Sequence, residues 1–424
     1  MSSILIKNAY IVNPADSFEG ESDILVKDGF IAQIGKDISV AADETIDAAG
    51  LVAAPGLIDV HSHFRDPGFT HKEDIITGAG AAAAGGYTTV VLMCNTKPPI
   101  DNVETLEYVL EKGHLTGIRV ESCATVTVGM KGEELTDYAA LVKAGAAGFT
   151  DDGIPIMDQE VLRKALLESK PFGKPVSLHE ENRNLISENG INAGEASLFY
   201  GVKGSPREAE ISMIERDIDI LRETGGIMNI QHISTAEGVE LVRKGKKDGL
   251  TGLHAEATPQ HFSLTEKALI EKGSFAKLNP PLRTEEDRLA VIEGLKDGTI
   301  DIIATDHAPH SAEEKAAEIT KAPSGMTGLE TALPLAVTHL VRESGMKLID
   351  VLAKFTVNPA AMYSFTDRGN LKEGYKADIV LFNPDEEIVV GDFKSKAVNS
   401  PFTGEKLYGA VHFVICDGRV IVRK

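Results

Sequence analysis

The middle of the chain alternates short apolar runs with stretches of helical periodicity. Most of the runs follow a glycine or proline, and they are short enough for buried strands. Eight runs of this kind lie between residues 57 and 304. They cover Leu57–Val60, Thr88–Met93, Ile118–Ala124, Ala146–Phe149, Val176–Leu178, Ile227–Ile230, Leu253–Ala257 and Ile300–Ala304. Eight strands that alternate with helices predict an α/β fold, a (β/α)8 TIM barrel.

The clearest helical stretch is predicted over residues 206–223. Ser205 is expected to cap it, with Glu208 completing a capping box, and Gly225 is expected to end it. Apolar residues recur along the stretch at helical spacing, at Ile211, Ile214, Ile218 and Leu221.

Both ends of the chain have the alternating pattern of antiparallel strands. Asp28-Gly29 and Asp417-Gly418 each lie between two short apolar runs, which favours a two-residue hairpin turn. We therefore predict a small β-sandwich domain built from both termini, with two independent hairpins as the alternative. The predicted boundaries are residues 1–52 with 368–424 for the β-sandwich and 53–367 for the barrel.

Composition excludes several classes of function for this chain. A net charge of -21 over 424 residues argues against a nucleic acid or an anionic membrane as partner. No apolar run approaches the roughly 20 residues of a membrane span, and the N-terminus lacks the pattern of a signal peptide. The three cysteines, Cys94, Cys123 and Cys416, lie in apolar runs and are expected to be buried thiols. We therefore predict a cytoplasmic protein.

Two histidines, His61 and His63, end the first predicted barrel strand. Side chains at i and i+2 of a strand point to the same face, so both can reach one metal ion. Functional groups of such barrels gather at the carboxyl ends of the strands, so polar residues that follow later strands should join these histidines. Those residues are Asn95, Asp152, His179, His232 and Asp306.

The expected cluster contains nitrogen and carboxylate donors without thiolates. This set favours zinc, with manganese or cobalt as alternatives. Six ligands are too many for one tetrahedral ion, whereas two ions that share a bridging carboxylate would use them all. The cluster therefore predicts a metal-dependent hydrolase that acts on an amide-like carbonyl.

The longer strings around these residues resemble the amidohydrolase superfamily and, within it, the bacterial type I dihydroorotases. The resemblance runs from about residue 4 to residue 422. It implies a zinc enzyme of pyrimidine (UMP) biosynthesis that interconverts N-carbamoyl-L-aspartate and (S)-dihydroorotate plus water. The strings are Asp59–Asp66, Met93–Thr96, Phe149–Gly153, Lys277–Pro281 and Ala304–His310.

The resemblance also implies the metal ligands. Asp152 would bridge two zinc ions, with Asp151 as the competing bridge and a single bound zinc as the alternative occupancy. Some relatives bridge with a carbamylated lysine, but no lysine lies between Lys143 and Lys164, which favours a carboxylate. The first zinc would be held by His61, His63 and Asp306, and the second by His179 and His232.

The implied reaction is attack of a metal-bound hydroxide on a cyclic amide, with Asp306 as general base and then general acid. Arg65 would grip the substrate carboxylate, because a guanidinium can bind a carboxylate with two hydrogen bonds. An ion pair of Arg65 with Asp66 or Glu73 is the alternative, and Asn95 has the alternative role of a turn residue. The implied substrate-binding residues are His63, Arg65, Asn95, Asn279, His310, Ser324 and Gly325.

Two positions depart from the family pattern. Ser324 stands where relatives often have an aromatic residue, and Gln260 stands where they often have histidine. His261 is expected to give structural support. The charged segment 311–324 is interpreted either as a lid over the site or as a solvated loop.

Three other functions remain as alternatives. Allantoinases and dihydropyrimidinases cleave related cyclic amides, but they generally use the lysine bridge and need not bind a ring carboxylate. Some chains of this kind have lost metal ligands and act as structural partners of aspartate transcarbamoylase, which the complete ligand set argues against. A homodimer is the family expectation, and association of an active enzyme with aspartate transcarbamoylase stays open.

Overall fold

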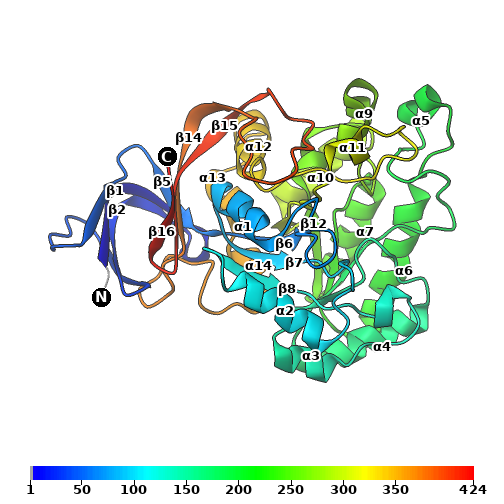
Figure 1. Cartoon of the computed structure of the whole chain (residues 1–424), viewed down its shortest axis with the longest axis horizontal. Helices are drawn as coiled ribbons and strands as arrows, with labels where there is room; N and C mark the ends of the chain where they lie inside the picture. Colours follow the sequence, from blue (N-terminus) through cyan, green and yellow to red (C-terminus); the bar gives the residue numbers. More distant parts are fainter. Residues whose placement is uncertain (1–2) are drawn as a thin grey trace.

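The computed structural model describes residues 3–424 and contains eight parallel barrel strands. In Figure 1 the barrel lies on the right and the strands of the two termini lie on the left. Each predicted apolar run overlaps one of the barrel strands, and the barrel prediction is confirmed. The barrel strands are β6 (Leu57–Ser62), β7 (Tyr87–Leu92), β8 (Arg119–Ser122), β9 (Phe149–Thr150), β10 (Val176–Leu178), β11 (Met228–Ile230), β12 (Leu253–Ala257) and β13 (Ile302–Ile303).

Two short contacts close the barrel. Strands β6 to β8 form one parallel sheet and β9 to β13 form another. An isolated parallel bridge between Ala124 and Phe149 joins the sheets on one side, and a bridge between Ser62 and His307 joins them on the other. The amide of His63 donates to the carbonyl of His307 over 2.9 Å, so the second junction lies beside the predicted metal ligands.

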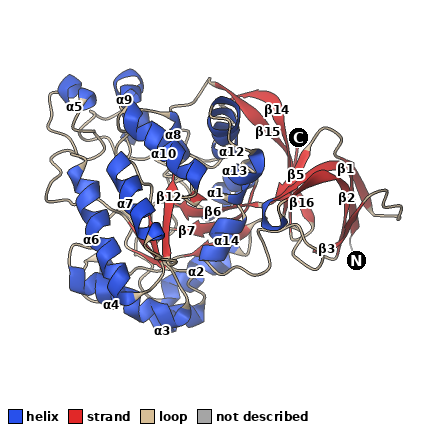
Figure 2. Ribbon diagram, turned by 180° about the vertical axis from the view of Figure 1, so that it is seen from behind, coloured by secondary structure: helices blue, strands red, loops and turns tan. Residues whose placement is uncertain are grey.

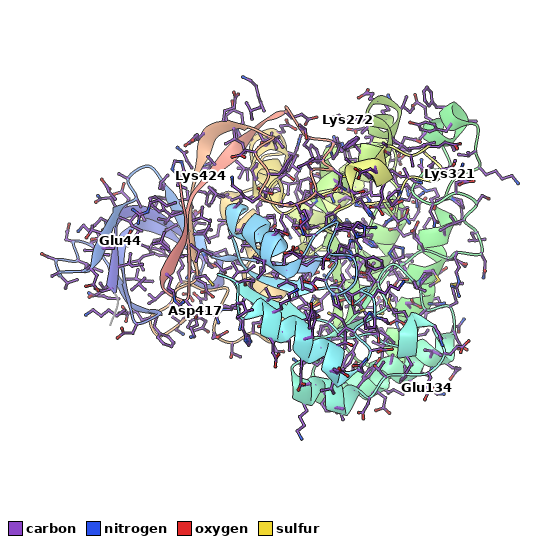
Figure 3. All side chains as sticks on the ribbon, in the orientation of Figure 1. Glu44, Glu134, Lys272, Lys321, Asp417 and Lys424 are labelled. Atoms are coloured by element: carbon purple, nitrogen blue, oxygen red, sulfur yellow. The ribbon has the colours of Figure 1, made fainter. Side chains whose placement is uncertain are left out.

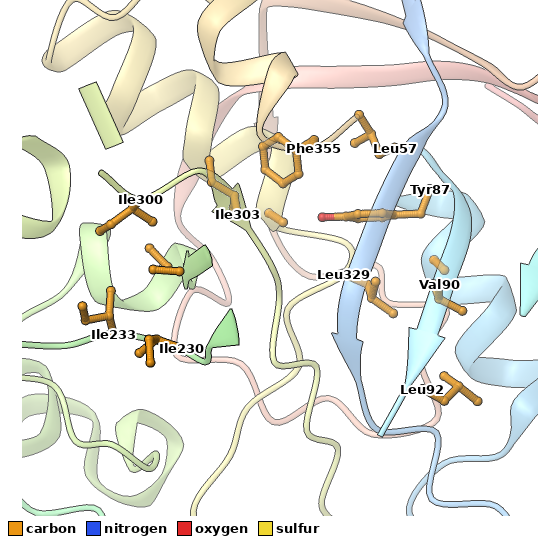
Figure 4. Close-up of a cluster of buried hydrophobic side chains, with 14 of the residues drawn as sticks. Leu57, Tyr87, Val90, Leu92, Ile230, Ile233, Ile300, Ile303, Leu329 and Phe355 are labelled. Atoms are coloured by element: carbon orange, nitrogen blue, oxygen red, sulfur yellow. The ribbon is translucent and has the colours of Figure 1, made fainter. Parts of the chain in front are cut away.

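Helices cover the outside of the strands (Figure 2). Strand residues such as Leu57, Ile230 and Ile303 are buried in one large apolar core with helix and loop residues (Figure 4). The barrel helices are α1 (Ile75–Ala84), α2 (Val103–Gly113), α3 (Tyr138–Ala144), α4 (Gln159–Ser169), α6 (Glu208–Thr224), α7 (Ala236–Lys247), α10 (Glu285–Asp297) and α12 (Ala332–Leu335), which continues as a π-helix over Ala336–Glu343.

Short helices lie in the connections. They are α5 (Glu195–Tyr200), α8 (Pro259–Ser263), α9 (Lys267–Lys272), α11 (Ala312–Lys315), α13 (Leu348–Ala353) and α14 (Val357–Met362), with 3-10 turns at Pro14–Asp16, Val128–Met130, Lys170–Phe172 and Gly273–Ala276. No helix in residues 3–424 is long and apolar enough to cross a membrane. Cys94, Cys123 and Cys416 are buried free thiols, as predicted.

The predicted cap of α6 is wrong. The helix starts at Glu208 behind Arg207, which offers no side-chain cap. The Ser205 hydroxyl donates instead to Glu181 over 3.4 Å, and its amide donates to the Ile191 carbonyl over 2.7 Å. These tertiary contacts hold Ser205 outside the helix. The predicted end is confirmed, because Gly225 has a left-handed φ of 64°.

Strands from both termini form one mostly antiparallel sheet, in the order β16-β15-β14-β5-β1-β2-β3 with β4 beside β1. Strand β5 pairs with both β1 and β14, which contradicts two independent hairpins. Asp28-Gly29 and Asp417-Gly418 have positive φ in the predicted turns. The strands are β1 (Ser3–Asn13), β2 (Phe18–Lys27), β3 (Phe30–Gly35), β4 (Glu44–Asp47), β5 (Val52–Pro55), β14 (Ile379–Val389), β15 (Lys406–Cys416) and β16 (Arg419–Arg423).

The domain boundaries stay a prediction. Residues 1 and 2 of the predicted first segment lie outside the described residues. The connection between β14 and β15 falls within the predicted terminal domain, yet Asn399 in it hydrogen-bonds to barrel residues Ala308 and His310.

Candidate metal centre

The six predicted metal ligands are buried together where the barrel strands end. His61 lies on β6, and the others lie in the loops that follow β6, β9, β10, β11 and β13. None is more than 7% exposed. The set is His61, His63, Asp152, His179, His232 and Asp306.

The Asp152 carboxylate lies at the centre of this set. Its Oδ1 is 3.4 Å from His61 Nε2, 3.6 Å from His179 Nδ1 and 3.8 Å from His232 Nε2. Its Oδ2 is 3.3 Å from His63 Nε2. One carboxylate therefore faces all four histidines, which is the position that a bridging ligand requires.

Asp306 completes one side of the cluster. Its Oδ1 is 3.1 Å from His63 Nε2 and 3.5 Å from His61 Nε2. Donor atoms of these three residues lie within 4.8 Å of one another, and so do those of His61, Asp152 and His232. The structure thus contains two overlapping groups of candidate ligands, with His61 common to both.

The cluster fits divalent cations in its donors and its charge. His61 Nε2 is buried and makes no hydrogen bond within residues 3–424, although it faces both aspartates. Two buried carboxylates at one point need nearby positive charge, and oxygen and imidazole donors without thiolate suit zinc.

Electrostatics keeps both aspartates ionised. Burial alone would raise the pKa of Asp306, but the charge of His61 and the hydrogen bond from His63 outweigh it and lower this pKa to about 2. Burial likewise opposes the ionisation of Asp152, yet His61, His179 and His232 hold its pKa well below the usual range. Both carboxylates are therefore available as anionic ligands at neutral pH.

Three of the four histidines are oriented by a hydrogen bond from the ring nitrogen that does not face Asp152. His61 Nδ1 donates to Glu256 Oε1 over 2.5 Å, and His179 Nε2 donates to Glu181 Oε2 over 3.0 Å. His63 Nδ1 donates to Asn95 Oδ1 over 2.9 Å. In each ring the other nitrogen faces Asp152. Such partners fix the tautomer and direction of a ligating imidazole.

Glu256 and Glu181 were missed by the sequence reasoning. Glu256 is a fully buried carboxylate between Ala255 and Ala257 of strand β12, and that unusual position was the available signal. Glu181 lies two residues after His179, where no strand continues, so the i and i+2 argument does not apply. Each glutamate bonds to a candidate ligand, His61 or His179, and would position that ring without binding the metal itself.

Three residues that line the cavity beside the cluster have a strained backbone. Arg65, His232 and Asp306 have φ of 59°, 33° and 46°, a region that L-residues rarely adopt. The buried Asp59 supports the Asp306 turn by accepting from the Thr305 amide at 2.8 Å and from the Thr305 hydroxyl at 2.7 Å. Strain held in this way is typical of functional sites.

Asp151, the competing bridge, points to a different part of the fold. Its Oδ1 accepts from the amides of Val126 at 2.8 Å and Thr127 at 3.2 Å, and its Oδ2 accepts from the Thr127 hydroxyl. Asp152, in contrast, lines the cavity that contains the histidines. The two neighbouring carboxylates thus occupy separate environments.

A cavity of about 180 Å³ opens beside the cluster and brings all the predicted substrate-binding residues together. A larger cavity of about 540 Å³, near the amino end of β8, contains none of them. The predicted residues that line the smaller cavity are His63, Arg65, Asn95, Asn279, His310, Ser324 and Gly325.

Arg65 and His310 adjoin each other in this cavity. Arg65 Nη2 lies 3.4 Å from His310 Nε2, and Arg65 Nε donates to the Pro309 carbonyl over 3.3 Å. Asp66 pairs with Lys112 at 2.6 Å, while Glu73 bonds to Thr77, Ser395 and Lys396. Neither acidic residue pairs with Arg65 in residues 3–424, so the guanidinium is left to face the cavity.

The segment 311–324 forms the short helix α11 and a loop beside the cavity. Buried Lys315 donates to the carbonyls of Pro323 at 3.0 Å and Gly325 at 2.8 Å. The Ser324 hydroxyl donates to Asn279 Oδ1 over 3.0 Å. A gating role for this segment stays a prediction.

Gln260 and Ser324, the two residues that depart from the family pattern, both donate side-chain hydrogen bonds. Gln260 Nε2 donates to the Thr305 carbonyl over 2.9 Å, next to Asp306. His261 Nδ1 lies 2.8 Å from Thr258 Oγ1, and its Nε2 donates to the Pro280 carbonyl over 3.1 Å. His261 therefore makes structural contacts with both nitrogens.

The chain matches the amidohydrolase family over residues 52–421. It is 49% identical over 421 residues to a curated dihydroorotase of Clostridium acetobutylicum, with 99% of each chain covered. It is 50% identical over 420 residues to a curated dihydroorotase of Lactococcus lactis, with the same coverage.

Solved structures share the fold at lower identity. An L-hydantoinase (dihydropyrimidinase) from Arthrobacter aurescens superposes with a TM-score of 0.90 and 26% identity, covering 100% of this chain and 97% of its own. A D-hydantoinase superposes with a TM-score of 0.88 and 24% identity, which shows the fold alone.

Proposed function

The chain belongs to the amidohydrolase family, and from this membership we propose how the residues of its buried cluster share the work of a dihydroorotase. The activity is hydrolysis of a carbon–nitrogen bond in a cyclic amide, and its reverse closes N-carbamoyl-L-aspartate into (S)-dihydroorotate. The hydantoinases share the fold at 23–26% identity, whereas dihydroorotases share about half of all residues over the full length.

We propose two zinc ions in the cluster. His61, His63 and Asp306 would hold the first, His179 and His232 the second, and Asp152 would bridge them. The position of the Asp152 carboxylate opposite all four histidines supports this assignment. When bound, such a pair supplies a water of lowered pKa and a Lewis acid for a carbonyl oxygen.

Asp306 is the proposed proton carrier. In hydrolysis its carboxylate accepts a proton from the attacking water while the new carbon–oxygen bond forms. It then delivers that proton to the ring nitrogen as the carbon–nitrogen bond breaks. In cyclisation the same carboxylate takes the proton from the carbamoyl nitrogen. Its lowered pKa keeps it ionised, so it carries no proton before the attack.

Arg65 is the residue that most favours dihydroorotate as the substrate. Dihydroorotate has a ring carboxylate, and Arg65 lines the cavity of the ligand cluster without an acidic partner in residues 3–424. A partly buried guanidinium that lacks an anionic partner favours an anionic ligand. Asn95 and His310 would bind the same carboxylate, while Asn279, Ser324 and Gly325 would contact the ring.

Turnover of three cyclic amides tests the proposed substrate. We expect kcat/KM for dihydroorotate to exceed that for allantoin or dihydrouracil by at least about 10³-fold, because those rings leave Arg65 unpaired. Steady-state hydrolysis of each ring by one purified preparation makes the comparison. Faster turnover of allantoin or dihydrouracil would assign the site to the corresponding relative.

Replacing Arg65 with methionine tests the carboxylate grip. We expect kcat/KM for dihydroorotate to fall by about 10²–10³-fold, since a buried carboxylate loses its charged partner. Arg163→Met is the matched control, because Arg163 pairs with Glu160 and Glu223 on the outer helices. An Arg65→Met protein that retains kcat/KM removes Arg65 from this role.

Further properties rest on the resemblance to bacterial dihydroorotases and are proposals. They are a homodimer, a cytoplasmic location, and an activity that is compatible with binding to aspartate transcarbamoylase. The complete set of ligands supports an active enzyme over an inactive structural partner.

A further inference from the structure

The connection between β14 and β15 leaves the terminal sheet and reaches the mouth of the barrel. Figure 1 shows it extending from these strands toward α11. Lys272, labelled in Figure 3, donates to the Pro401 carbonyl over 2.6 Å. At the other end of the connection, Lys396 Nζ donates to the Thr70 carbonyl over 2.7 Å. The connection is thus attached to helix α9 near one end and to the loop after β6 near the other.

A buried carboxylate fixes the first half of this connection. Glu73 is fully buried and accepts from the Lys396 amide at 3.2 Å and from the Ser395 hydroxyl. His307 Nε2 lies 3.6 Å from the same carboxylate. The connection is therefore held beside the segment that leads from Asp306 to His310.

Asn399 bonds to two cavity segments at once. Its Nδ2 donates to the carbonyls of Ala308 at 3.2 Å and Gly325 at 3.1 Å, and its Oδ1 accepts from the His310 amide at 3.1 Å. Its own carbonyl accepts from the Thr327 amide at 3.1 Å. Every polar group of its side chain is used, and the residue is 2% exposed.

These contacts lie behind the predicted substrate-binding residues. Ala308, His310 and Gly325 line the cavity, whereas Asn399 does not. Within residues 3–424 the His310 amide makes its hydrogen bond to Asn399 alone. Asn399 can therefore affect a bound molecule only through the residues that it holds.

The two segments tolerate little change in their separation. A Cβ added at Gly325, whose φ is +125°, would lie 2.7 Å from the Ala308 Cβ and 3.2 Å from His310 Nε2. The backbone of the Gly325 segment also approaches His310 directly, because His310 Nε2 donates to the Ser324 carbonyl over 2.9 Å. A shift of either segment changes where the His310 ring meets the cavity.

We propose that Asn399 is a positioning residue for substrate binding, which sets the spacing between the His310 segment and the Gly325 segment. The inference rests on the proposed function, in which His310 and Gly325 contact dihydroorotate. Asn399 touches neither the metal ligands nor the substrate. Its effect should therefore fall on KM, with kcat and metal content largely unchanged.

Two substitutions of Asn399 test this role. Asn399→Ala removes all three side-chain hydrogen bonds, while Asn399→Asp has the same size and keeps only the acceptor for the His310 amide. We expect each to raise KM for dihydroorotate by about tenfold or more, with kcat within about threefold of the parent enzyme. Metal content should match that of the parent enzyme in both.

Ser400→Ala is the matched control. Ser400 is the next residue and is also buried, but its hydroxyl accepts from the Phe402 amide within the same connection at 3.3 Å. Its KM should stay within about twofold, because no contact to the cavity segments is lost. Thermal unfolding of all variants identifies any protein that fails to fold, and Asn399→Asp then decides the question.

Unchanged KM in a folded Asn399 variant would overturn the inference, and so would an equal rise in Ser400→Ala. A fall in kcat with loss of metal would assign Asn399 a structural role instead. Failure of the parent enzyme to hydrolyse dihydroorotate would overturn the proposed function itself, so the two failures are distinguishable.

Discussion

Asp306→Asn should lower kcat on the order of 10³-fold in both directions while the protein keeps its bound metal. The asparagine amide has nearly the same shape and retains an oxygen toward His63 and His61, which lie 3.1 Å and 3.5 Å from Oδ1. It cannot accept the proton of the attacking water. Proton transfer is lost and the ligand position is kept, so kcat falls while KM changes little.

Hydrolysis and cyclisation rates, measured with metal analysis of the same samples, check this expectation. Asp301→Asn is the control, because Asp301 lies at the opposite end of β13, where it pairs with His254 and Lys246. Its kcat should stay within about threefold of the parent value. Near-normal turnover of metal-loaded Asp306→Asn would remove Asp306 as the proton carrier.

Asp152→Asn should lose at least one of the two proposed metal ions, and kcat should fall on the order of 10³-fold. The neutral amide has one oxygen and carries no charge to balance two cations. In the parent enzyme the two carboxylate oxygens face His61, His179 and His232 on one side and His63 on the other. No other carboxylate within residues 3–424 contacts all four rings in this way.

Asp151→Asn, at the neighbouring residue, is the matched control for Asp152→Asn. Its Oδ1 would still accept from the amides of Val126 and Thr127, so metal content and most of the activity should be retained. Metal content of the two variants, measured beside kcat, separates the residues. The opposite pattern, with metal lost only from Asp151→Asn, would move the bridge to Asp151.

The barrel and the position of the cluster followed from local patterns in the sequence. Each strand is a short apolar run, and a buried parallel strand needs no more than that signal. Once eight such strands were expected, the polar residues directly after them had to converge, since the strands share one carboxyl edge. That is why His61, Asp152 and Asp306 could be placed together from chain positions far apart.

The supporting contacts could not be predicted, because they depend on how distant segments pack. Glu256 meets His61 across 195 positions of the chain, and only barrel closure brings them to 2.5 Å. Asn399 arrives from a connection that belongs, by sequence pattern, to the terminal sheet. The prediction that Ser205 caps α6 was wrong for the same reason, since Ser205 bonds to Glu181 rather than to the helix.

Metal analysis of the purified protein, run beside an assay of N-carbamoyl-L-aspartate cyclisation, tests whether the cluster is the metal site of a dihydroorotase. We expect two zinc ions per chain and formation of dihydroorotate. Chelation should abolish that activity, and added zinc should restore it. Full activity in metal-free protein would contradict the metal-dependent site, and zinc-loaded protein that forms no dihydroorotate would contradict the assigned reaction.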